Sequence, residues 1–317
     1  MDTHPQGPIM RQPGAIRMVR ADVGDSVDEA AGLYERRQTM NRQRGALVII
    51  GGAEDKRGDM TVLREFVRLA GGGHARIVVM TVATELPVEV GANYIDVFEK
   101  IGVEDVRTFD VSSREAADRL SARKAIEHAT GVFFTGGEQI RITKLLGGTL
   151  VDAALHSGNE QGLILAGTSA GASMMSSTMI VEGAAETNPR IGIVNMAPGM
   201  EFIDGVVIDQ HFAQRGRLGR LLSAVAQYPH HLGLGIDEDT AVVVRGTEFE
   251  VIGRGAVSVV DAGALLFSNL GNLRHNDALA LCGVKLHVLP AGYRFLLRER
   301  KPDLDPHDRT LPITGEP

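Results

Sequence analysis

Short apolar runs and helical periods alternate along the first half of the chain. The run 46–50 is apolar throughout and ends at Gly51, and apolar side chains then recur at helical spacing between 63 and 70. The same order repeats, with strands expected at 76–82, 106–111, 131–134 and 162–166 and helices at 88–101 and 120–129. Strands without polar alternation are typical of a parallel sheet that helices cover on both faces. The pattern therefore predicts a doubly wound α/β core.

The pattern changes after about residue 233. Short β-rich runs separated by Gly-containing turns are expected at 241–244, 248–252, 256–260 and 285–289. Such runs are typical of an antiparallel meander. The meander would form either an added sheet layer or a continuation of the main sheet.

Both ends of the chain lack these periods. Residues 1–43 carry Pro5, Pro8 and Pro13, and the chain is polar from Pro302 onward. We expect a disordered or loosely docked extension over 1–43, a single α/β domain over 44–300 and a frayed tail over 301–317.

Composition and charge exclude several classes of protein. The 33 Lys and Arg against 40 Asp and Glu give a net charge of −7, which disfavours generic nucleic-acid binding. Cys282 is the single cysteine, so a disulfide scaffold and a Cys-based zinc site are excluded. No apolar run approaches the ~18 residues of a membrane span and the first 20 residues are not a secretory signal, so we expect a cytoplasmic protein.

Glycine is in excess, with 38 among 317 residues against an average near 7%. Gly-rich segments follow three predicted strands, at 51–56, 135–139 and 166–172. In open α/β sheets ligands bind outside the carboxyl ends of the strands, so chemistry is expected at these segments. The first of them is either a phosphate-type turn or a structural strand end. Dinucleotide, P-loop and H-E-x-x-H motifs are missing from the sequence, and we expect no cofactor or metal.

The third Gly-rich segment reads G-x-S-x-G from Gly167 to Gly171. At the end of a strand this motif forms a sharp turn that exposes a serine hydroxyl, here that of Ser169. The N–H of Ala170 would then face a developing oxyanion. The motif predicts a serine nucleophile.

A serine nucleophile needs a base and an acid that orients it. His211 is the best candidate base, because it follows the apolar run 206–208, whereas His230 and His231 follow Pro229 in a loop. The order serine, acid, histidine is typical of α/β-hydrolases and directs the search to carboxylates between Ser169 and His211. We favour Glu186 there, with Glu182 as the alternative.

Three arginines follow the histidine closely: Arg215, Arg217 and Arg220. Such a run is either a solvated basic helix face or a site for substrate carboxylates, which the guanidinium fork binds well. Arg217 and Arg220 are three residues apart and would share a helix face.

Together these four motifs resemble those of the cyanophycinases, serine peptidases related to aspartyl dipeptidases. The resemblance covers roughly 45–300. It implies the class I glutamine amidotransferase-like fold, a three-layer α/β sandwich with a mostly parallel sheet flanked by helices and an antiparallel β-rich C-terminal part. It also implies a homodimer that cuts cyanophycin, poly-aspartate with arginine on each β-carboxyl, into β-Asp-Arg dipeptides.

The resemblance assigns roles to individual residues. Ser169 matches the nucleophile, His211 the base and Glu186 the acid, and the N–H of Gly137 becomes a second oxyanion donor beside that of Ala170. Positions that line the substrate pocket match Gln139, Asp209, Gln210, Arg215, Arg217 and Arg220. Two alternatives stay open: a dipeptidase acting on Asp-X peptides, and a non-catalytic binding protein on the same fold.

Overall fold

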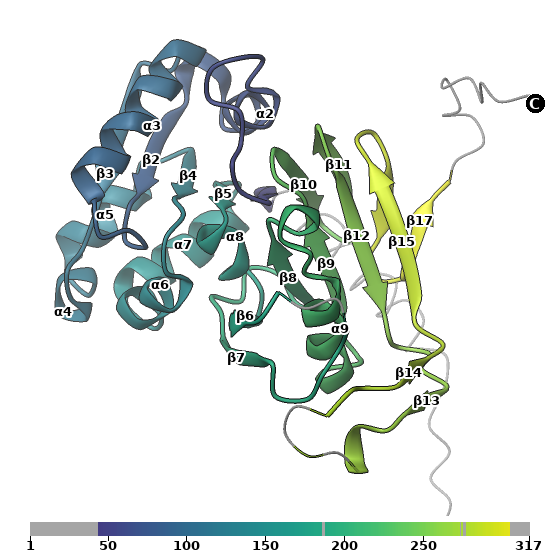
Figure 1. Ribbon diagram of the computed structural model, residues 1–317. Helices are drawn as coiled ribbons and strands as arrows, with labels where there is room; N and C mark the ends of the chain where they lie inside the picture. The colour runs from purple at the N-terminus through teal and green to yellow at the C-terminus, as the bar shows by residue number, and fades with distance from the viewer. Residues whose placement is uncertain (1–43, 186–187, 273, 275–276, 305–317) are drawn as a thin grey trace, which may run out of the picture. The chain divides into compact units, whose positions relative to one another are not determined.

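The computed structural model describes residues 44–185, 188–272, 274 and 277–304 (Figure 1). The extension expected over 1–43 and the part of the tail from 305 onward lie outside these residues.

The main sheet is parallel on one side and antiparallel on the other. Within the described residues it has nine strands in the order β17-β16-β11-β10-β1-β5-β4-β2-β3. Its parallel strands are β1 (Leu47–Ile50), β2 (Arg76–Met80), β3 (Asp105–Phe109), β4 (Gly131–Phe134) and β5 (Ile164–Thr168). Its antiparallel strands are β10 (Thr240–Arg245), β11 (Glu248–Gly253), β16 (Arg294–Leu296) and β17 (Lys301–Asp303).

A second, smaller sheet lies beside the first (Figure 1). Within the described residues its order is β15 (Lys285–Pro290), β12 (Ala256–Asp261), β9 (Leu232–Ile236) and β8 (Val206–Gln210). Two hairpins join β6 (Thr178–Gly183) to β7 (Val194–Pro198) and β13 (Phe267–Ser268) to β14 (Leu281–Cys282).

The helices cover the sheets. They are α2 (Thr61–Leu69), α3 (Pro87–Ile101), α4 (Arg114–Ala117), α5 (Leu120–Glu127), α6 (Gln139–Leu146), α7 (Leu150–Glu160), α8 (Ala170–Ser173) and α9 (Leu218–Gln227), with short 3₁₀ turns η1 (Gly72–His74), η2 (Ala213–Arg215) and η3 (Leu270–Asn272). No helix in the described ranges combines the length and apolar character that a membrane crossing requires.

Two apolar cores lie on the two faces of the main sheet. Leu47 and Ile49 of β1 point into the core shared with α5 to α8 and the second sheet, and Val48 and Ile50 point into the core shared with α2 and α3. Neighbouring residues of a strand face opposite sides, so an uninterrupted apolar strand is what a sheet covered on both faces requires. The predicted three-layer α/β class is confirmed.

The C-terminal β-rich runs combine both arrangements that the sequence left open. β10 and β11 continue the main sheet, whereas β12 and β15 belong to the second sheet. The expected frayed tail is wrong at its start, because Lys301–Asp303 pairs with β16 as an edge strand. Backbone pairing to β16 orders this segment although two of its three side chains are charged.

Candidate active site

Ser169 stands on a strained turn between β5 and α8. Its backbone has φ +53° and ψ −108°, a conformation that L-residues rarely adopt. A Cβ at Gly167 would lie 2.1 Å from the carbonyl oxygen of Gly171, and one at Gly171 would lie 2.5 Å from that of Phe134. Both glycines are therefore needed for the chain to turn this sharply, as the G-x-S-x-G motif predicts.

His211 meets this serine from the second sheet. It directly follows β8, and its Nε2 lies 3.1 Å from the Oγ of Ser169. Its backbone N–H donates to the carbonyl oxygen of Gly51 at 2.7 Å, which joins the ends of β8 and β1. Only 9% of the residue is exposed. The structure thus brings the predicted nucleophile and base together.

The carboxylate on the other side of the imidazole is Glu238. Its Oε1 lies 2.6 Å from the Nδ1 of His211. The predicted acid, Glu186, lies outside the described residues, and its alternative Glu182 is exposed on β6. Among the described residues Glu238 makes the contact to His211 that was predicted for Glu186, and the three side chains follow one another along the chain as serine, histidine and carboxylate.

Sheet pairing explains why the sequence analysis missed Glu238. β8 and β9 are parallel neighbours with Gln210 opposite Ile236, so the residues after both strands emerge at the same edge. The chain order serine, acid, histidine, typical of α/β-hydrolases, places the acid before His211 and so excludes Glu238. The apolar run 232–236, followed directly by Asp237, Glu238 and Asp239, was the signal that could have found it.

The surroundings of His211 favour the neutral imidazole. Burial lowers the pKa of His211 below its ordinary value of 6.5, Glu238 opposes this effect and the positive charge of Arg215 adds to it. An imidazole that is neutral near pH 7 can accept the serine proton.

Two backbone N–H groups beside the serine are available as oxyanion donors. A Cβ at Gly136 would lie 3.5 Å from the Cβ of Ser169, so the turn after β4 faces the nucleophile. Among the described residues, neither Ala170 nor Gly137 donates its N–H to a hydrogen bond, whereas Glu138 donates to the carbonyl oxygen of Ala83 at 2.9 Å. Gly137 has φ +145°, and a Cβ there would lie 2.1 Å from that same oxygen. Only glycine fits.

Gln139 has a structural contact that its predicted role did not include. The side-chain Nε2 donates to the carbonyl oxygens of Ile180 and Val181, at 2.8 and 2.9 Å. It therefore ties the start of α6 to the β6–β7 hairpin, and its amide nitrogen is occupied within the protein.

Two arginines of the predicted cluster, Arg217 and Arg220, form ion pairs with the buried Asp209. Arg220 binds Asp209 through two nitrogens, with Nε to Oδ2 at 2.9 Å, and Arg217 lies 3.4 Å from the same carboxylate. The Nη1 of Arg217 also donates to the Oε1 of Gln210 at 2.9 Å. Asp209 and Gln210 thus face the arginines, not the solvent.

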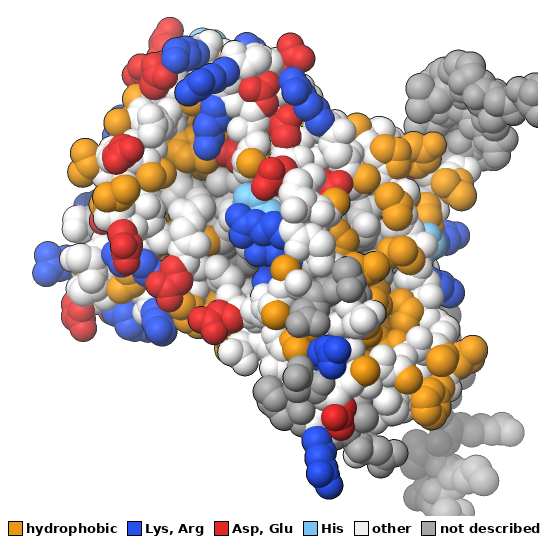
Figure 2. Space-filling model, viewed as in Figure 1, with side chains coloured by type: hydrophobic (Ala, Val, Ile, Leu, Met, Phe, Trp, Pro, Cys, Tyr) orange, Lys and Arg blue, Asp and Glu red, His pale blue; other side chains and the backbone are white. Residues whose placement is uncertain are grey.

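One arginine keeps an unused donor. Within the described residues the Nε of Arg217 is buried without a hydrogen-bond partner. Burial lowers the pKa of Arg217 to about 10, and Asp209 counteracts this effect, so the group is charged at neutral pH. Arg215 is exposed beside it. Figure 2 shows basic side chains gathered next to a histidine in the middle of the face viewed.

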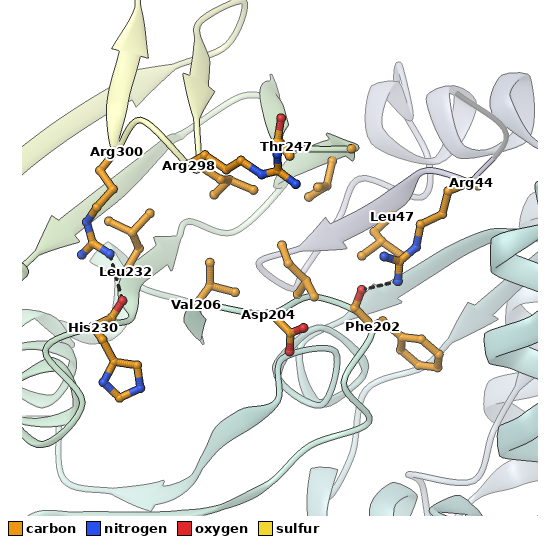
Figure 3. Close-up of a pocket in the computed structure, with 16 residues that line it drawn as sticks. Arg44, Leu47, Phe202, Asp204, Val206, His230, Leu232, Thr247, Arg298 and Arg300 are labelled. Atoms are coloured by element: carbon orange, nitrogen blue, oxygen red, sulfur yellow. Dashed lines mark hydrogen bonds between the residues drawn. The ribbon is translucent and has the colours of Figure 1, made fainter. Parts of the chain in front are cut away.

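A separate cavity of about 380 Å³ lies at the other end of the strands (Figure 3). It is lined by Leu47, Val206 and Leu232, at the amino ends of β1, β8 and β9. Two of its arginines form hydrogen bonds with the backbone: Arg44 donates to the carbonyl oxygen of Phe202 and Arg300 to that of His230. This cavity is not part of the site around Ser169, which follows a carboxyl end.

Known proteins are similar in sequence to this chain over most of its length. The model of peptidase family S51 matches residues 47–252. A cyanophycinase of Trichormus variabilis is 40% identical over 265 residues, which cover 83% of this chain and 89% of the relative. A cyanophycinase of Geminocystis herdmanii is 38% identical over 82% of this chain and 96% of its own.

A solved structure shares the fold. The crystal structure of a peptidase from an acI-B1 Actinobacterium superposes with a TM-score of 0.58 at 20% identity, covering 82% of this chain and 99% of that one. The resemblance drawn from the four motifs is confirmed by the sequence relatives, and so is the serine-type peptidase class. The chain belongs to peptidase family S51.

Proposed function

We propose that this chain is a cyanophycinase, a serine-type exopeptidase that hydrolyses cyanophycin to β-Asp-Arg dipeptides. The observation that carries the proposal is the alignment of Ser169, His211 and Glu238 at one edge of the sheets, with distances of 3.1 and 2.6 Å. It is supported by curated cyanophycinases that are 37–40% identical over at least 80% of the chain.

The first half of the reaction forms an acyl-enzyme. The Oγ of Ser169 attacks the scissile carbonyl carbon while the Nε2 of His211 takes the hydroxyl proton. The carbonyl oxygen becomes an oxyanion, which the N–H groups of Ala170 and Gly137 would stabilise. When the C–N bond breaks, His211 returns the proton to the leaving amine and an ester remains on Ser169.

The second half releases the acid product. Water attacks the ester, His211 takes its proton and then returns it to the Oγ of Ser169. Glu238 fixes the tautomer that carries hydrogen on Nδ1 and stabilises the imidazolium in both halves. The histidine ends each cycle neutral.

The local charge suits a substrate with both signs. Three arginines against the carboxylate of Asp209 leave a positive excess that would attract backbone or terminal carboxylates of cyanophycin. Arg215 is exposed, so we assign carboxylate binding to it, and the buried Nε of Arg217, which has no hydrogen-bond partner among the described residues, is the second donor of this assignment. Glu138, exposed at the tip of β4, is our choice for the substrate guanidinium, since Asp209 is occupied by Arg220.

The direct test is product release. Purified protein incubated with insoluble cyanophycin should release β-Asp-Arg, measured by mass spectrometry, and Ser169→Ala should abolish the release. Ser157→Ala, at an exposed serine on α7, is the matched control and should keep full activity. Full activity of Ser169→Ala would overturn the mechanism.

A second substrate and a labelling experiment separate the alternatives. Turnover of short Asp-X peptides without attack on the polymer would identify a dipeptidase. Failure of a serine-directed phosphonate to label Ser169 would indicate a binding protein without catalysis.

We also propose that the enzyme is a homodimer. The supporting feature is β15, an edge strand of the second sheet on which Leu286 and Val288 are 51% and 59% exposed. Exposed apolar edge strands pair readily with other chains. Light scattering should give twice the mass of one chain, and Val288→Lys should shift it toward the monomer. A monomeric wild-type protein would refute this assembly.

A further inference from the structure

The loop 51–56 holds a buried carboxylate that the mechanism above does not use. Glu54 is 4% exposed, and its carboxylate accepts two hydrogen bonds of 2.5 Å, from the Oη of Tyr94 and from the Oγ1 of Thr168. The Nζ of Lys56 lies 3.2 Å from the Oε1 of Glu54 and 4.5 Å from the centre of the Tyr94 ring. A buried carboxylate is tolerated because such partners replace its hydration.

The Tyr94 side of this network is rigid. Tyr94 comes from α3, is 4% exposed, and packs its ring 4.7 Å from that of Phe133. Burial and the negative charge of Glu54 raise the pKa of Tyr94 well above its ordinary value, so its hydroxyl remains a donor. The carboxylate is therefore held in place by a donor that is itself fixed by packing.

The Thr168 side leads to the nucleophile. Thr168 is the last residue of β5 and directly precedes Ser169, whose N–H donates to the carbonyl oxygen of Ile50 at 3.1 Å. The positive φ of Ser169 costs free energy and persists only when the surroundings impose it. The hydrogen bond from Thr168 to Glu54 fixes the residue from which this strained turn departs.

The same loop also contacts His211 and Asp239, the residue that follows Glu238. A Cβ at Gly52 would lie 2.4 Å from the Nε2 of His211, and the carbonyl oxygen of Gly52 accepts from the N–H of Asp239. The N–H of Asp55 donates to the Oδ1 of Asp239, the neighbour of Glu238. A rigid loop 51–56 would therefore keep serine, histidine and acid in register.

We propose that Glu54 is a positioning residue for the nucleophile: its carboxylate, held by Tyr94 and Lys56, fixes Thr168 and with it the backbone of Ser169. Glu54 contacts no reacting atom, so it acts through geometry alone. The proposal rests on the proposed role of Ser169 and makes the first Gly-rich segment a structural strand end with a catalytic purpose.

The test compares variants on the two sides of the hydrogen bond between Thr168 and Glu54. Thr168→Val removes the donor at nearly constant shape, Thr168→Ser keeps it, and Glu54→Gln removes the charge. We expect Thr168→Val and Glu54→Gln to lower kcat on cyanophycin by about 10- to 100-fold with KM nearly unchanged, the scale of a small misplacement of a reacting group. Thr168→Ser should recover most of the activity. The double variant should lose no more than the worse single one, because both act through one bond.

A control separates positioning from stability. Thr149→Val also removes a buried hydroxyl that is hydrogen-bonded, to the carbonyl oxygen of Leu146 at the start of α7, and should lower Tm without changing kcat. The rate of phosphonate labelling of Ser169 is the second readout, and it should fall in Thr168→Val as kcat does. Unchanged kcat and labelling in Thr168→Val, or a loss confined to KM, would overturn the proposal. Failure of the proposed function would show instead as unlabelled Ser169 or no dipeptide release from the wild type.

Discussion

At the scale of single residues, the site contains backbone conformations that residues other than glycine normally avoid. Ala53, Ser169, His211 and Asp239 all have φ between +47° and +53° although none is glycine. All four belong to the turns that carry or contact the site. Such strain persists where the surrounding structure imposes it, and it concentrates where function depends on geometry.

Glu238 gives the first prediction at this scale. Glu238→Gln removes the negative charge that orients His211, so kcat should fall by about 10⁴-fold, as for loss of a triad acid in other serine peptidases. Glu182→Ala and Glu186→Ala are the comparison variants and should keep at least a tenth of the activity. Steady-state kinetics on cyanophycin measures these changes. A larger loss of kcat in Glu186→Ala than in Glu238→Gln would identify Glu186 as the residue that orients His211.

The pKa of His211 leads to the second prediction for a single residue. The proposed base works when neutral, and burial lowers its pKa, so the midpoint of the acid limb of kcat/KM should lie below pH 6.5. Arg215 lowers this pKa by charge repulsion, so Arg215→Gln should raise it and move the acid limb of the pH profile upward. A limb that moves downward or stays fixed in Arg215→Gln would contradict this assignment of the charge.

At the scale of elements, function depends on the turns after five strands. β1, β4 and β5 end at one edge of the main sheet and β8 and β9 at one edge of the second sheet, and the hydrogen bond from the N–H of His211 to the carbonyl oxygen of Gly51 joins the two edges. The turns must approach one another closely, and glycine allows this since it has no Cβ.

A substitution at Gly52 tests the close approach of the loop 51–56 to the imidazole of His211. In Gly52→Ala the new Cβ would lie 2.4 Å from the imidazole of His211, so the ring must move and kcat should fall at least 100-fold. The matched control is Gly102→Ala, which has a similar φ of +107° but no atom within 4 Å, and which should lower Tm while leaving kcat unchanged. Equal kcat in both variants would show that His211 is not held by this contact.

At the scale of the whole molecule, a buried ion pair joins three parts of the fold. Asp209 lies on β8 of the second sheet, Arg220 lies on α9, and the Nη1 of Arg220 donates to the carbonyl oxygen of Gly183 in the β6–β7 hairpin at 3.0 Å. The side chain of Asp209 is fully buried. The pair therefore links the layer that carries His211 to the hairpin beside Gln139.

Breaking this pair should destabilise the protein. Arg220→Met leaves the Asp209 carboxylate with the longer contact to Arg217 and the N–H of Gln210, and the free energy of unfolding should fall by about 3–5 kcal/mol. Urea denaturation followed by circular dichroism measures this. The double variant Asp209→Leu/Arg220→Met, which carries neither charge, should be more stable than Arg220→Met alone. An unchanged free energy of unfolding in Arg220→Met would mean that the pair contributes no net stability.

Much of the fold and part of the site follow from the sequence. Apolar runs and helical periods locate β1, β2, β4, β5 and most of the helices around them, because burial on both faces requires apolar residues in a strand. β3 was also placed, although it has no fully buried residue and lies at the edge of the sheet. The G-x-S-x-G motif locates Ser169, and the run before His211 places that residue at a strand end. These are local patterns, which local sequence determines.

What the sequence could not decide is which distant segments become neighbours. The approach of Glu238 to His211 depends on the parallel pairing of β8 with β9, and the order of Lys301–Asp303 comes from its pairing with β16. Neither pairing is visible in the local sequence. The arginine cluster was readable as a cluster, but only the tertiary structure shows Asp209 inside it. Local propensity acts between residues close in the chain, whereas pairing register and the solvation of buried charge depend on contacts that exist only after the chain has folded.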